Sequence, residues 1–191
     1  MGTCDRVLAQ SLIPDCDSPQ EPGVNGVAYI INLADIDRDN CTLDAQNPSI
    51  IETLALKTGK KAYKVEQLGN QPFTGTNTAT EVGTYGNKKT KTVAFAILDH
   101  CPDITENVID VLDRGSFAVI MENNSHGSDG KGKYEIYGYG SGLHLTTSNR
   151  ELYGDADGGW VIEMQSTERK SGMFIFNTDI ATTDAMIAAL L

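Results

Sequence analysis

The sequence contains no long apolar run, because none of its stretches approaches the ~20 apolar residues that a transmembrane helix needs. The first residues likewise lead into no apolar segment of the kind found in signal peptides. The four cysteines are irregularly spaced and include no C-x-x-C pair: Cys4, Cys16, Cys41 and Cys101. Such spacing favours free thiols in a reducing compartment over disulfides. We therefore expect a protein that is synthesised in a cytoplasm and has no contact with a membrane.

Basic residues are also scarce. The 15 lysines and arginines stand against 26 acidic residues, which leaves a formal net charge of −11. This excess argues against tight binding to a nucleic acid, although DNA could pass close by without being held. The charge is unevenly distributed: residues 57–91 carry seven lysines and two acids, whereas residues 1–50 and 101–191 are acidic. Lysines in the basic segment either protect exposed strand edges or dock on an acidic face of a second copy.

Signatures of catalysis and of cofactor binding are missing as well. Residues 127–133 match the G-x-x-x-x-G-K spacing of a phosphate-binding loop, but a strand pattern follows where that loop requires Ser or Thr and a helix. We interpret them as a glycine-rich hairpin loop. The three histidines, His100, His126 and His144, have neither metal-ligand spacing nor an evident nucleophile to activate. We therefore predict that the protein is not an enzyme and holds no metal or cofactor.

The acidic cluster of Asp35, Asp37 and Asp39 is the segment most similar to a cation site. An EF-hand loop needs a glycine at its sixth position and a glutamate at its twelfth, where this sequence has Asn40 and Gln46. A turn between two strands is the simpler interpretation. The alternative is a monomeric, cation-dependent binding module in which these three carboxylates hold calcium.

The segments that are present predict a mainly β domain. The expected strands cover residues 26–33, 49–56, 62–68, 92–98, 117–122, 134–139, 143–147, 160–165 and 174–176. One helix is predicted over residues 103–114, with Asp103 as N-cap, Glu106 completing a capping box and Gly115 at its end. A short C-terminal helix is expected over residues 183–190. The later strands suggest an antiparallel meander, so we expect an α+β fold: an antiparallel β-sandwich or barrel with one packed helix.

Two segments lack the side chains to fill a core. Residues 1–25 contain three of the six prolines and predict an extended N-terminal arm, after which residues 26–191 form a single β-rich domain. Residues 70–92 are dominated by Thr, Gly and Asn. Threonine favours strands, but few of these side chains could enter a core. The segment therefore predicts an exposed hairpin or long loop that rests on another surface.

Several segments, taken in order, resemble a known group of proteins. They are Lys-Lys-Ala-Tyr-Lys at 60–64, the Thr-rich stretch 73–85, Phe-Ala-Val-Ile-Met-Glu-Asn-Asn at 117–124 and Tyr-Glu-Ile-Tyr-Gly-Tyr-Gly-Ser-Gly-Leu at 134–143, followed by the strand of Trp160. This order resembles structural proteins of phages and prophages of Bacteroides-type bacteria, in particular tail tube proteins. The resemblance covers roughly residues 26–191.

The resemblance implies a β domain that assembles into stacked six-membered rings, the DNA-conducting channel of a virion tail. The partners are then other copies of the chain, other tail proteins and DNA that passes without specific binding. Residues 1–25 and 70–92 correspond to an arm and a loop that reach neighbouring subunits. The expected interface residues are Phe73, Thr74, Thr76, Thr78, Thr80, Val82, Tyr85, Lys88, Lys89 and Lys91. A neck or connector ring, a capsid decoration protein and the inner tube of a contractile injection system are the related alternatives.

Overall fold

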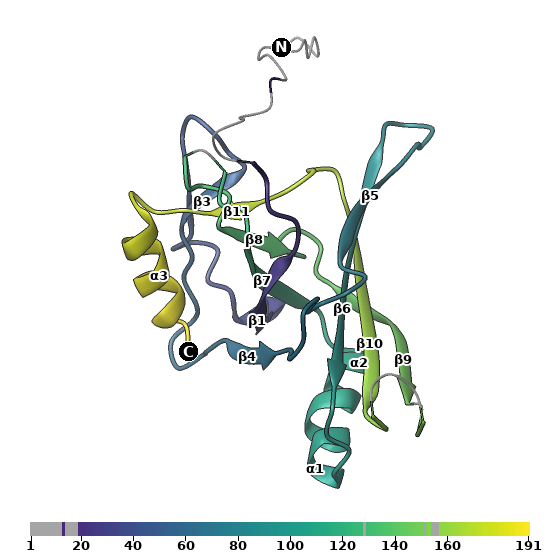
Figure 1. Cartoon of the computed structure of the whole chain (residues 1–191). Coiled ribbons are helices and arrows are strands. Elements are labelled where there is room, and N and C mark those ends of the chain that lie inside the picture. The colour runs from purple at the N-terminus through teal and green to yellow at the C-terminus, as the bar shows by residue number, and fades with distance from the viewer. Residues whose placement is uncertain (1–12, 14–18, 128, 151, 154–156) are drawn as a thin grey trace.

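The computed structural model describes residues 13, 19–127, 129–150, 152–153 and 157–191. Most of the predicted N-terminal arm, residues 1–25, lies outside the described residues. Two β-sheets and the helices that pack on them make up the described part (Figure 1). In this part of the chain, no helix is long and apolar enough to cross a membrane.

The larger sheet has seven strands in the order β2-β3-β11-β8-β7-β1-β4. They are β1 (Val24–Asn32), β2 (Thr42–Leu43), β3 (Ile50–Thr53), β4 (Tyr63–Glu66), β7 (Phe117–Asn123), β8 (Tyr134–Tyr137) and β11 (Phe174–Ile175). Neighbouring strands are antiparallel, except that β3 and β11 run parallel. Residues 117–121 of β7 are all buried, because both faces of this strand are covered.

The smaller sheet has four antiparallel strands in the order β5-β6-β10-β9. They are β5 (Asn77–Glu81), β6 (Lys88–Ile97), β9 (His144–Arg150) and β10 (Trp160–Glu168). The predicted single meander is wrong, since the chain changes sheets between β8 and β9. Gly138 makes this change possible: its φ is +78°, and a Cβ there would lie 2.7 Å from the carbonyl oxygen of Phe117.

The predicted helix runs from Pro102 to Arg114 as three joined segments. They are α1 (Pro102–Ile104), a π-helical turn (Thr105–Ile109) and α2 (Asp110–Arg114), and Gly115 ends the helix. The predicted N-cap is wrong: Cys101 is the N-cap residue and makes no side-chain capping bond. Pro102 takes the first helical position because its fixed φ suits that position and its missing N–H would have no partner there. Asp103 therefore lies inside the helix.

An apolar core fills the space between the two sheets. It contains buried side chains from both sheets, including Val119 of β7 and Ile162 and Met164 of β10. Ile109 and Leu112 of the helix close one end of this core. The predicted β-sandwich with one packed helix is thus confirmed, and the barrel alternative is wrong because neither sheet closes on itself.

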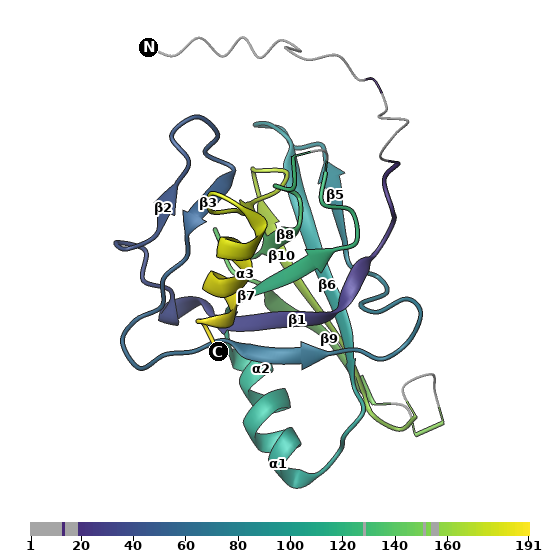
Figure 2. The same ribbon diagram turned by 60° about the vertical axis from the view of Figure 1, so that its left-hand side comes forward.

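A second core lies on the other face of the larger sheet, under the helix α3 (Ile180–Ala188) (Figure 2). Ile187 and Leu190 pack there against Ile120 and Ile136 of the sheet. The short C-terminal helix is confirmed, but it begins three residues before the predicted start at 183. The reason is Asp179, whose side chain accepts a hydrogen bond of 2.7 Å from the Thr182 N–H and caps the helix.

Candidate assembly surface

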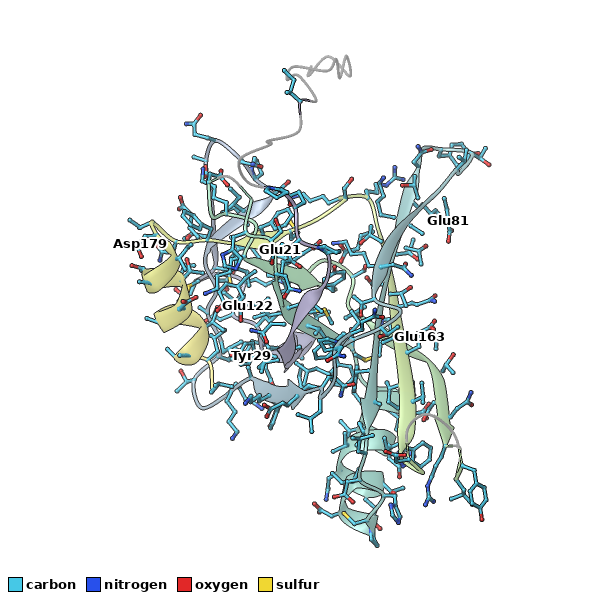
Figure 3. All side chains as sticks on the ribbon, viewed as in Figure 1. Glu21, Tyr29, Glu81, Glu122, Glu163 and Asp179 are labelled. Atoms are coloured by element: carbon cyan, nitrogen blue, oxygen red, sulfur yellow. The ribbon has the colours of Figure 1, made fainter. Side chains whose placement is uncertain are left out.

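The segment 70–92 contains a hairpin that projects from the smaller sheet. Strand β5 pairs only with β6, and all five of its residues are exposed. Figure 1 shows β5 and the first part of β6 rising beyond the rest of the sandwich. Glu81, labelled in Figure 3, pairs across the hairpin with Lys88, so residues 82–87 form the connecting tip. Strand β5 is held by its ladder with β6 rather than by core side chains, whereas β6 also pairs with β10 as far as Lys89.

The tip carries two apolar side chains in water. Val82 is 89% exposed and Tyr85 is 91% exposed. The basic residues Lys88 and Arg169 lie beside them, and Arg169 donates a long hydrogen bond of 3.5 Å from Nη1 to the carbonyl oxygen of Tyr85. Exposed apolar groups within a polar, basic surface are typical of contact sites for other proteins. The tip is therefore the best-defined candidate contact among the predicted interface residues.

The predicted threonines have two different settings. Thr78 and Thr80 of β5 are exposed, and the Thr80 hydroxyl accepts a hydrogen bond of 2.6 Å from the Lys89 ammonium. Thr74 is exposed and donates to the carbonyl oxygen of Gln71 at 2.6 Å. Thr76 is half-buried, and its hydroxyl accepts a hydrogen bond from the Ala94 N–H. Thr76 therefore supports the hairpin base, whereas the other threonines line an accessible surface.

Two of the predicted interface residues are inaccessible to a partner. Phe73 is only 4% exposed and belongs to the core between the sheets. Lys91 is 0% exposed, and its Nζ lies 2.9 Å from Oε2 of Glu168 at the end of β10. The contact is an ion pair without the directional geometry of a hydrogen bond. Lys91 thus serves neither of the two roles expected for the lysines, because β6 turns its odd-numbered side chains toward the core.

The buried ion pair is part of a larger polar group at the base of the hairpin. Oε1 of Glu168 accepts the Gly140 N–H at 3.1 Å, so the carboxylate also anchors the loop between β8 and β9. The Lys91 ammonium lies 5.9 Å from the ring centre of Tyr137, whose hydroxyl donates to Oε2 of Glu135 at 3.2 Å. Burial raises the pKa of Glu135, while the Tyr137 hydrogen bond and the attraction of Lys91 oppose the rise. Sequence patterns gave no signal for this group, because its members come from three strands.

The outer face of the smaller sheet is partly exposed and mostly uncharged. Strands β6 and β10 pair in register from Lys89 to Ile97, so alternate residues point away from the core. Those of β10 include Val161, Glu163, Gln165 and Thr167, and Glu163 is visible on this strand in Figure 3. Those of β6 include Thr90, Ala94 and Ala96, which are partly exposed, and Thr92, which is buried. The face therefore presents hydroxyl, amide and methyl groups with few charges.

A groove of about 1360 Å³ opens at the other end of β6. Its walls are the edge strand β4, the end of β6 with the following residues, and the helix of residues 102–114. Four apolar side chains that line it are exposed to between 46% and 85%: Tyr63, Leu68, Leu98 and Val111. Sequence analysis missed the groove, because its residues come from segments that only the fold brings together.

The other sequence motifs have structural roles. The strands on either side of the glycine-rich segment, β7 and β8, pair antiparallel, as expected for a hairpin. Lys133 of this segment reaches both carboxylate oxygens of Asp184 on α3, at 2.7 and 2.8 Å. Asp35 lies 3.3 Å from the Lys60 ammonium, and Asp37 accepts a hydrogen bond from the Asn40 side chain.

The arrangement of the reactive side chains therefore does not indicate what the protein does. Among the described residues, no three His, Cys, Asp or Glu side chains gather closely enough to hold a metal ion. The features that stand out are two surfaces, the hairpin tip and the apolar groove. Comparisons of the chain with protein family models, with curated proteins and with solved structures find no match.

Proposed function

We propose that this chain is a virion structural protein, the tail tube protein of a phage, which assembles into stacked hexameric rings. The observation that supports the proposal most directly is the β5–β6 hairpin, which ends in the nearly fully exposed Val82 and Tyr85. A monomer leaves this tip in water, whereas an assembly covers it. The sequence resemblance over residues 26–191 suggests which assembly this is, and the hairpin provides a physical need for a partner.

The two sheets also leave edges that an assembly could cover. The smaller sheet ends on β5 and β9, and the larger sheet ends on β2 and β4. Uncovered edges expose backbone N–H and C=O groups that pair readily with another chain. Identical copies can contact each other through two different surfaces. They close into a ring when a whole number of copies, each rotated by the same angle, completes a full turn. A tube needs such a ring and a second contact that repeats along its axis.

In this proposal the outer face of the smaller sheet lines the channel. Its charged groups are few, with Glu81 and Glu163 against Lys88 near the tip. Phosphate groups bind proteins mainly through lysine and arginine, so a wall of threonine, amide and acidic side chains holds DNA weakly. The genome would then slide during ejection without specific binding. The protein would be synthesised in the cytoplasm of the bacterial host and would reside in the virion tail.

Electron microscopy of the full chain tests the proposal. We expect rings or short tubes with a central channel at high protein concentration, or in the presence of the other tail proteins of the same phage. Rings without stacking would favour a neck or connector role. A protein that remains monomeric even with those phage proteins present would refute the assignment to the tail.

A further inference from the structure

The tip of the hairpin and the apolar groove lie at opposite ends of the same strand. The tip immediately precedes β6, and residues 95–99 at the far end of β6 line the groove. Ten residues of extended strand span about 30 Å, so a copy cannot place its own tip in its own groove. Figure 1 shows the same separation, with the hairpin at one end of β6 and the helix of residues 102–114 at the other.

We infer that the groove between β4 and the helix of residues 102–114 receives the hairpin tip of a second copy. The inference builds on the proposed self-assembly and names the two surfaces that meet. Val82 and Tyr85 would lie against the apolar side chains of the groove, which include Leu68, just after β4, and Val111 of the helix. Each copy uses its tip toward one neighbour and its groove toward another, which makes the contact heterologous.

The size of the groove suits a segment of protein. Pockets for small ligands have volumes of about 300–1,000 Å³ and enclose most of the ligand. This groove, at about 1360 Å³, is larger and is bordered by side chains that remain largely exposed, such as Leu68. One tyrosine and one valine, together with their backbone turn, fill such a volume better than a buried small molecule does.

The charges of the two surfaces are complementary. The tip is flanked by three basic residues, Lys88, Lys89 and Arg169. The acidic residue next to the tip, Glu81, accepts a hydrogen bond from the hydroxyl of Thr90. The groove is lined by Asp99 and Asp157 in addition to Lys64 and Glu66, which pair with each other at 3.1 Å.

Other acids lie beside the groove and strengthen its negative character. Glu106 and Asp110 line a hollow on the adjacent helix surface, next to Val111, where they outnumber the single basic residue of that hollow, Arg114. Backbone N–H groups of Cys101 and His100 lower the pKa of Asp99, so this carboxylate is charged at neutral pH. Basic tips and acidic grooves attract each other between copies, and like surfaces repel, which fixes the head-to-tail order.

A mixing experiment with two variants of the full chain tests the contact. The tip variant carries Val82→Ser and Tyr85→Ser, and the groove variant carries Leu68→Ser and Val111→Lys. All four side chains are exposed enough that the variants should fold, which circular dichroism checks. Ile180→Ser, at a 36% exposed position on α3, away from both the tip and the groove, is the matched control and should assemble like the wild type.

Sedimentation velocity should find that the self-association of each variant alone is at least about 30-fold weaker than that of the wild type. This is the effect of losing one interface hot spot. A mixture of the two variants in equal amounts should form a heterodimer and nothing larger. In that pair, the intact tip of the groove variant occupies the intact groove of the tip variant, so only the two altered surfaces stay free. A mixture that stays monomeric, or a variant that assembles like the wild type, would overturn the inference.

A photo-cross-linker in place of Tyr85 gives an independent measurement that does not depend on the folding of the groove variant. Mixing isotopically labelled and unlabelled chains shows whether a cross-link joins two copies. We expect links to residues 63–69 and 95–111 of the other copy. Links to residues 1–25, or to a protein other than this chain, would assign the tip a different partner and overturn the inference. Rings that form while these links are absent would leave the proposed function standing and remove only this contact.

Discussion

The ion pair between Lys91 and Glu168 provides a sharp test of how the hairpin is held to the sandwich. The Lys91 side chain is fully buried, and the Glu168 side chain is 8% exposed. Glu168→Gln keeps the shape of the side chain and its acceptor for the Gly140 N–H, but it removes the charge that faces the ammonium. Lys91 then has only the more distant Glu135 to oppose its charge, in a site that water hardly reaches.

The expected loss of stability follows from the burial of this ammonium. Removing one partner of a buried ion pair costs about 3–5 kcal/mol, because the other charge remains without compensation. We expect the lower end of that range, about 3 kcal/mol, because Glu135 still attracts Lys91. For a domain of this size each kcal/mol shifts Tm by about 2–4 °C, so Tm should fall by about 6–12 °C. The double variant Lys91→Met/Glu168→Gln should recover most of this loss, because the uncompensated ammonium is gone and Glu135, whose pKa is already raised, loses only the attraction of Lys91.

Urea unfolding measures these differences. The single tryptophan, Trp160, lies on the same strand as Glu168 and reports the unfolding of the smaller sheet by its fluorescence. Glu163→Gln is the matched control on that strand, since Glu163 belongs to the outer face and should change the free energy of unfolding by less than about 1 kcal/mol. If Glu168→Gln is as mild as this control, the pair is hydrated in solution and the reasoning about its burial is refuted.

Three further predictions concern the hairpin and its base. Replacing residues 82–87 by Asn-Gly, which forms a two-residue hairpin turn, should preserve the circular dichroism spectrum and abolish assembly in sedimentation; loss of the spectrum would show that the tip is needed for folding. Reversing Lys88 and Lys89 to Glu should weaken association most at low salt, because salt screens exposed charges, whereas Lys131→Glu should have no effect; an equal effect of both would contradict a specific contact. Because the pKa of Glu135 is raised in the fold, this group stabilises the protein below its unfolded pKa of about 4.5, and that contribution is lost as pH rises through the folded pKa. The urea midpoint should therefore fall as pH rises from about 4.5 to 7, and Glu135→Gln should make this fall smaller. If the fall is unchanged in the variant, other groups cause it.

Local sequence patterns located most of the strands, because alternation and short apolar runs report which side chains face a core. They missed β2 and left β5 as part of an exposed hairpin or long loop, because all the residues of these two strands are exposed. They also located the helix near residues 102–114, whose apolar residues recur at helical spacing. The details of its start were missed, since Pro102 and Asp103 compete for the first positions and the proline prevails. The start of α3 was missed for a related reason: Asp179 caps it from a segment without apolar periodicity.

The sequence predicted that the lysines of residues 57–91 share one role, and this is wrong for Lys91. Lys88 is exposed at the hairpin tip, whereas Lys91, three residues later, is buried against Glu168. A count of charges along the sequence cannot distinguish the two lysines, because it contains no information on burial. Their difference arises because Glu168 lies far away in sequence and becomes a neighbour only when β10 pairs with β6.

The sequence by itself determined the class of fold, the acidic character of the chain and the presence of an exposed Thr-rich segment, because these depend on composition and on short-range periodicity. Only the tertiary structure decided which of the predicted contact residues are accessible, and it alone revealed the apolar groove opposite the tip. The physical reason is that a groove is made by side chains from separate segments, here β4, the end of β6 and a helix. No pattern within one segment encodes the distance between them.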